Sequence, residues 1–124
     1  MTADTVTVGL SKSANEKLNE LHELEIFSEK MDGYRFAIGL ALAHGVVPPE
    51  ISKRETFLNV GSLDPDQSLR RSVEALMPEQ LLETTPYRLI ERLADWGVNE
   101  MYLQATHGDI DFVAIFDRLG QQAS

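Results

Sequence analysis

The sequence contains no cysteine. This absence excludes a disulfide-stapled fold, a thiolate metal site and a cysteine nucleophile. Basic residues are also scarce, because 11 Lys and Arg stand against 20 Asp and Glu, for a formal net charge of −9. A chain this acidic lacks the broad cationic surface with which proteins neutralise nucleic-acid phosphates, although a local contact stays open.

Long apolar runs are missing as well. The longest apolar region, residues 36–43, is about half of the roughly 18 residues that a membrane span requires. The first five residues are polar and include Asp4, whereas a signal peptide has a basic start and then an apolar stretch. With 124 residues, the chain has the length of one domain, or of one domain with an appendage. We therefore expect a cytoplasmic protein without membrane contact.

A short strand is predicted close to the N-terminus. Val6, Val8 and Leu10 fall on one face of the extended chain, with Thr5 and Thr7 on the other. No hairpin turn follows, so the strand must pair with a distant strand or with another chain.

Two helices are predicted after this strand. Ser13 and Glu16 form a capping box, which begins a helix that ends near Glu25. The buried face of this helix follows three-residue steps, with Leu18, then Leu21, and then either Leu24 or Glu25. Ser28 begins a second helix, which runs to about residue 43 and stops at Gly45.

The second helix carries a stripe of small side chains. Gly33, Ala37 and Ala41 lie four residues apart, and such a stripe lets another helix approach closely. The stripe has two readings: it packs helices within one chain, or it is the two-fold contact of a dimer. The unpaired strand favours the dimer.

The middle of the chain predicts one more strand and one more helix. Residues 56–60 form the strand. Asp64 caps the following helix, and Pro65 occupies its first position.

The C-terminal part is predicted to be helical. Residues 85–86 begin a helix that stops at Gly97, and residues 99–106 form another short helix. Residues 109–119 fit a helix or a buried strand, and we favour the helix. The fold class is therefore mainly α with one or two short strands.

The order strand, helix, helix resembles the ribbon-helix-helix superfamily. Residues 6–11 resemble the strand of that family, residues 14–25 its first helix and residues 28–43 its second. In that family, strands from two chains pair into a ribbon that enters the DNA major groove. The resemblance implies a homodimer or a higher oligomer, with Val6 and Val8 packed between the chains.

The same resemblance implies where DNA would be held. Thr5 and Thr7 would face the groove, and Ser28 to Lys30 would hold a phosphate at the start of the second helix. Outward positions of the family strand usually carry Arg, Lys, Gln or Asn, whereas Thr makes at most one modest base contact.

The arrangement is also similar to the small DndE proteins of bacterial DNA phosphorothioation systems. Residues 10–18 resemble their opening, and the strand at 57–61 with its following helix resembles their second half. We thus expect a ribbon-helix-helix-like unit with a following strand and helix at 1–78, and a helical extension at 79–124 on the same core.

Two groups of polar residues are candidates for chemistry. Lys53 and Arg54 could form a small phosphate-binding spot with Arg35, or could be solvated surface charges. His107, Asp109 and Asp111 could bind a divalent cation. The alternative for this cluster is a helix stop followed by a capping aspartate, which we favour.

The leading hypothesis is a non-enzymatic, dimeric interaction module that associates with DNA and needs no metal or cofactor. Its contact residues are Thr5, Thr7, Ser28, Lys30, Arg35, Lys53 and Arg54, and its packing residues are Val6, Val8, Gly33, Ala37 and Ala41. One alternative is an antitoxin-like subunit whose segment 78–124, with 3 basic and 8 acidic residues, binds a basic protein. The other is a small metal-dependent enzyme centred on His107, Asp109 and Asp111.

Overall fold

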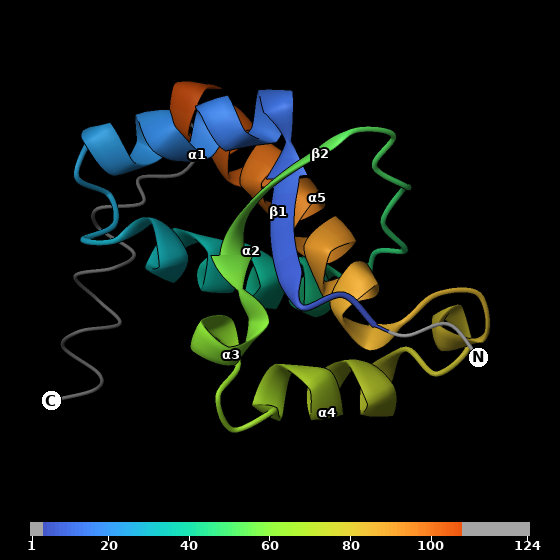
Figure 1. Ribbon diagram of the computed structural model, residues 1–124. Coiled ribbons are helices and arrows are strands. Elements are labelled where there is room, and N and C mark those ends of the chain that lie inside the picture. The colour runs from blue at the N-terminus through green and yellow to red at the C-terminus, as the bar shows by residue number, and fades with distance from the viewer. Residues whose placement is uncertain (1–3, 108–124) are drawn as a thin grey trace, which may run out of the picture.

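The computed structural model describes residues 4–107, which form a mainly helical fold with one two-stranded antiparallel sheet, as the sequence predicts (Figure 1). The elements in chain order are β1 (Thr7–Ser11), α1 (Lys12–Glu23), α2 (Lys30–His44), β2 (Arg54–Asn59), α3 (Val60–Leu63), α4 (Ser68–Leu76), the 3-10 turn η1 (Gln80–Leu82) and α5 (Pro86–His107). The helix expected at residues 109–119 lies outside the described residues.

The N-terminal strand pairs within the chain. β1 runs antiparallel to β2, from Thr7 opposite Asn59 to Ser11 opposite Arg54. The other edge of β1 faces α5, whose carboxylates accept hydrogen bonds from the backbone of the strand. Both edges of β1 are therefore occupied, and the predicted ribbon with a second copy of β1 is wrong for this chain.

The strand is also buried more deeply than its alternating pattern predicts. Val8, Gly9 and Leu10 are all buried, because β1 packs against β2, α5 and α1. Val6 precedes the strand and is 75% exposed, so it does not pack on the core of its own chain. The register skips Phe57, because Val8 lies opposite Leu58 and Gly9 lies opposite Thr56. This skipped residue makes β2 a bulged strand.

The turn between α1 and α2 differs from the prediction at both helix ends. Ser11, not Ser13, caps α1, and its Oγ accepts from the Ala14 amide at 3.2 Å. The helix closes in a Schellman turn with Glu25 at φ 61°, a left-handed conformation that favours glycine. α2 begins after Glu29 rather than Ser28, and it ends at Gly45 as predicted.

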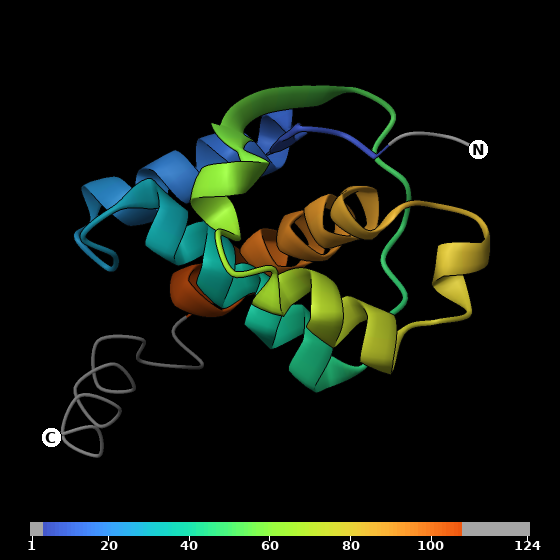
Figure 2. The same ribbon diagram turned by 60° about the horizontal axis from the view of Figure 1, so that its bottom comes forward.

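The helix α5 passes through Gly97 instead of stopping there. A Cβ at Gly97 would overlap the backbone of Ala37 on α2, so this glycine is the point of closest approach between two helices. Ala37 and Ala41 are fully buried, and α5 packs against α2, β1, α1 and α4. The small-residue stripe therefore packs helices within the chain, and the dimer reading of Gly33, Ala37 and Ala41 is wrong. Figure 2 shows α5 running between the strands and α4.

We predict opposite effects for two helical glycines. Gly97→Ala places a methyl group against the Ala37 backbone and should lower the free energy of unfolding by at least about 2 kcal/mol. Gly39→Ala is the matched control, because a Cβ there meets nothing within 4 Å and should stabilise α2 by about 0.5–1 kcal/mol. Urea unfolding measures both, and equal signs for the two variants would contradict the close α2–α5 contact.

Candidate functional site

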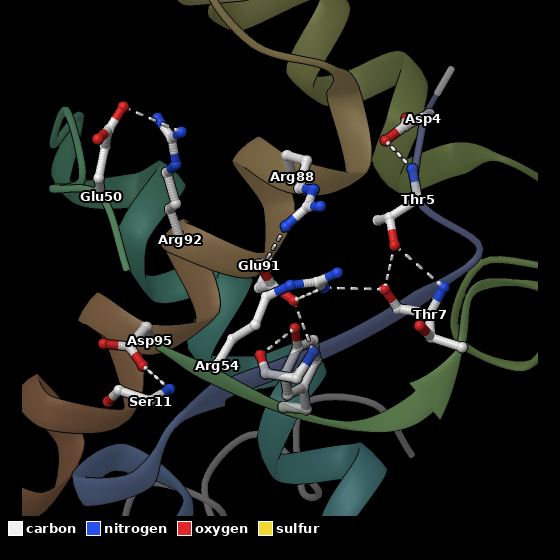
Figure 3. A network of polar contacts seen from close by, with 12 residues as sticks. Asp4, Thr5, Thr7, Ser11, Glu50, Arg54, Arg88, Glu91, Arg92 and Asp95 are labelled. Atoms are coloured by element: carbon white, nitrogen blue, oxygen red, sulfur yellow. Dashed lines mark hydrogen bonds and ion pairs between the residues drawn. The ribbon is translucent and has the colours of Figure 1, made fainter. Parts of the chain in front are cut away.

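A buried carboxylate lies where β1, β2 and α5 meet (Figure 3). Glu91 on α5 is 2% exposed. Its Oε2 accepts from the Gly9 amide at 2.8 Å and from Arg54 Nη1 at 2.7 Å. Arg88 approaches the other carboxylate oxygen only to 4.0 Å. The charge of Glu91 is thus balanced by one close guanidinium and one backbone donor, as a buried charge requires.

Two neighbours of Glu91 donate hydrogen bonds to backbone carbonyls at β1. The Tyr34 hydroxyl donates to the Gly9 carbonyl at 2.9 Å, and Arg54 also donates to the Thr7 carbonyl at 3.2 Å. A Cβ on Gly9 would overlap the Glu55 carbonyl oxygen, so only glycine fits. Burial, and then the nearby charge of Glu91, raise the pKa of Tyr34 well above its usual value, which keeps its hydroxyl a donor.

The next polar residues on this face of α5 repeat the arrangement. Asp95 accepts from the Ser11 amide at 2.7 Å, and Asn99 accepts from Lys17 Nζ at 2.7 Å. Glu91, Asp95 and Asn99 are four residues apart and therefore line one helix face. Two acids of the segment 78–124 thus bind β1 inside the protein and do not contribute to an outward acidic surface.

The start of α5 is held by two further carboxylates. Asp4 accepts from the Tyr87 amide at 3.0 Å, and the Tyr87 hydroxyl donates to Asp64 at 2.9 Å. Asp64 also accepts from the amides of Leu69 and Arg70, so it caps α4 from further back than predicted, because α4 begins only at Ser68. Burial, followed by the hydrogen bond to Asp64, raises the pKa of Tyr87 to about 12.

Most cations assigned to DNA contact are bound inside the chain. Arg54 pairs with Glu91, and Arg35 donates to the carbonyls at residues 62 and 63. Lys30 donates to an Asn15 side chain and lies 3.9 Å from the centre of the Phe57 ring. Lys53 is exposed. Arg35 and Arg54 therefore have different partners within the chain.

The polar residues of the predicted DNA contact have partners too. Thr5 Oγ1 donates to the Thr7 carbonyl at 2.6 Å, and Thr7 is half-buried. Ser28 donates to Asp32 at 3.1 Å, beside the exposed Glu29. A phosphate at the start of α2 would therefore meet two carboxylates.

The α1–α2 turn carries a feature that the sequence pattern concealed. The sequence pattern leaves either Leu24 or Glu25 to continue the buried face of the helix, but α1 ends at Glu23 and Leu24 is 63% exposed. Glu23 and Glu25 flank it, and both line a surface hollow of about 530 Å³ together with His22, Phe27 and Ser28. The sequence signal is the Glu-Leu-Glu triplet at the helix end.

The residues of the predicted metal site lie at or beyond the end of the described chain. His107 is the last residue of α5, and Asp109 and Asp111 lie outside the described residues. Within residues 4–107, no group of three or more His, Asp or Glu side chains could hold a metal ion. In the same part of the chain, no helix combines the length and apolar character needed to cross a membrane.

Comparison of the chain with family models, curated proteins and solved structures finds no match. The resemblance to ribbon-helix-helix and DndE proteins therefore stays a prediction from the sequence, and function is argued from the geometry of this chain.

We predict that Glu91→Ala lowers the free energy of unfolding by about 3–5 kcal/mol, because it leaves the Arg54 charge and the Gly9 amide without their buried partner. Glu74→Ala is the matched control, since Glu74 is an exposed partner of Arg70 and should contribute less than about 1 kcal/mol. Urea unfolding distinguishes the two, and similar losses would show that the Glu91 pair is not central.

We predict a second effect at alkaline pH. Because the pKa of Tyr87 is raised to about 12, the folded state holds this proton more tightly than the unfolded chain. Its contribution is complete below pH 10 and is lost as the pH rises through about 12. At pH 8, Tyr87→Phe should destabilise the protein by about 1 kcal/mol.

The difference between Tyr87→Phe and wild type should stay constant from about pH 6 to 8 and shrink above pH 10, because tyrosine titrates only in the higher range. Urea unfolding at each pH measures it. A difference that stays constant up to about pH 12 would contradict the raised pKa of Tyr87.

Proposed function

We propose that this protein is a non-enzymatic interaction module that binds a basic segment of a partner protein, through an apolar side chain of that segment, at the acidic turn between α1 and α2. The acidic turn consists of Glu20, Glu23, Leu24, Glu25 and Glu29. The observation that carries the proposal is a leucine, 63% exposed, whose two flanking glutamates line a surface hollow.

The charge of this region supports a basic partner. Residues 20–32 hold five acidic side chains and one lysine. That lysine, Lys30, is directed toward Asn15 and Phe57 and so does little to neutralise the turn. Complementary charge raises the rate of encounter with a cationic segment and aligns it.

Leu24 supplies what charge alone lacks. An exposed leucine gains about 1.5–3 kcal/mol when it is fully buried, which is a large share of a weak binding energy. The hollow at this turn is lined by Phe27 and by the two glutamates that flank Leu24. A segment with alternating basic and apolar side chains would cover Leu24 and pair with Glu23 and Glu25.

The backbone conformation of Glu25 also supports this proposal. A non-glycine residue in the left-handed region costs about 1–2 kcal/mol, and glycine is the usual residue at this position of a Schellman turn. With glutamate instead of glycine at this position, the protein is less stable but has a carboxylate next to Leu24. Binding surfaces are where such a loss is commonly retained.

The edge of β2 and the buried acids are less suited to a partner. The outer edge of β2 carries the bulge at Phe57 and begins beside Lys53, and both features discourage strand addition. The buried acids Glu91 and Asp64 and the buried Tyr87 hold backbone groups or one another, which assigns them to the fold rather than to catalysis.

The experiment uses a labelled peptide of alternating lysine and leucine as probe, titrated by fluorescence anisotropy at low salt. We expect binding that weakens as salt is added, because the contact is partly ionic. Peptides of alternating lysine and serine, or glutamate and leucine, should bind at least about tenfold more weakly, which is 1.4 kcal/mol. Equal affinity for all three peptides would contradict the proposal.

Matched variants locate the contact. Leu24→Ser should weaken binding about fivefold or more, whereas Leu76→Ser should leave it unchanged, because Leu76 is similarly exposed at 65% but lies on α4. Equal loss in the two variants would place the peptide elsewhere. Duplex and nicked DNA form a further arm of the titration, and DNA that binds more tightly than the lysine–leucine peptide would favour the ribbon-helix-helix hypothesis instead.

A further inference from the structure

A second hollow lies at the start of α5. The start of α5 is on the opposite side of the molecule from the α1–α2 turn (Figure 1). The volume of the hollow is about 490 Å³, within the range of small-molecule sites. It is lined by Leu81, Leu82, Glu83, Thr84, Thr85, Arg88 and Arg92. The hollow therefore combines two cations, two hydroxyl side chains and an apolar wall in a protein of net charge −9.

The two arginines have weak partners within the described chain. Arg88 Nη1 is 4.0 Å from Glu91, whose other oxygen already binds Arg54 at 2.7 Å. Arg92 Nη2 is 3.4 Å from Glu50, whose side chain is 83% exposed. A guanidinium has five N–H donors, so each arginine can bind an anion without losing a strong contact. Figure 3 shows both side chains on successive turns of α5.

Two threonines also line the hollow. Thr84 and Thr85 lead into α5 at Pro86, and the Tyr87 amide at this helix end already donates to Asp4 at 3.0 Å, so side chains rather than the helix end supply the donors for an anion. Thr85 Oγ1 is buried and has no hydrogen-bond partner among the described residues. Buried hydroxyls rarely lack a partner, but this oxygen lies below the surface of the hollow and is not counted among its donors.

We propose that this hollow binds a phosphate monoester that carries an apolar substituent. Arg88 and Arg92, one turn apart, bind the phosphate oxygens, because guanidinium forks match phosphate geometry. Leu82, which is 87% exposed, contacts the substituent. Glu83 on the rim disfavours ligands with additional negative charge. The site is independent of the acidic turn and stands whether or not a basic partner binds there.

The test follows backbone amide signals by NMR while phenyl phosphate is added to the full chain. We expect shifts concentrated at residues 84–92, with weaker binding of inorganic phosphate and of benzoate. Arg88→Gln with Arg92→Gln should reduce the affinity for phenyl phosphate at least about tenfold. Arg70→Gln with Arg71→Gln removes the same charge from α4 and should change the affinity less than about twofold.

Three outcomes would overturn the proposal: shifts spread over the whole surface, equal loss in the two double variants, or equal binding of benzoate and phenyl phosphate. If the first double variant fails to fold, Arg92→Gln alone replaces it, because the partner of Arg92 is an exposed carboxylate. An unchanged affinity in that single variant would likewise overturn it.

Discussion

The fold depends on the hydrogen bonds that one carboxylate makes at the junction of β1, β2 and α5. Glu91 binds the amide of Gly9 and the guanidinium of Arg54, and so joins three segments that are 37 to 82 residues apart in sequence. Its burial is tolerated because both partners are close. The absent side chain of Gly9 and the donor from Tyr34 are requirements of the same junction.

This junction changes the meaning of the acidic composition. The excess of negative charge in segment 78–124 suggested an outward surface for a basic partner, but two of its acids, Glu91 and Asp95, protect the edge of β1. A strand edge usually needs another strand, and here helical carboxylates accept from its amides instead. A group of exposed acids remains at the α1–α2 turn, on α1 and the start of α2.

Local signals predicted local structure well. The start of α5 at residues 85–86, the end of α2 at Gly45 and the strand near residues 56–60 were readable from capping residues and turn glycines. The contact of β1 with α5 could not be predicted in this way, because carboxylate–amide hydrogen bonds across more than 80 residues leave no periodic pattern in the sequence. Gly97 shows the same limit. A glycine can end a helix or let a second helix approach closely, and here the outcome depends on Ala37, sixty residues earlier. The internal partners of the predicted DNA-contact cations were not readable either, although three of the four, Lys30, Arg35 and Arg54, have acceptors within the chain.

The positions where the sequence departs from the needs of the fold are therefore the informative ones. Gly9 and Gly97 have no alternative, because a Cβ at either would overlap backbone. Glu25, in contrast, occupies a backbone conformation that glycine would relieve, and Leu24 remains in water although burial would stabilise it. Neither residue is explained by folding. Both lie in one turn with complementary chemistry, an apolar centre and a negative rim, and a cationic segment with an apolar side chain accounts for the two together.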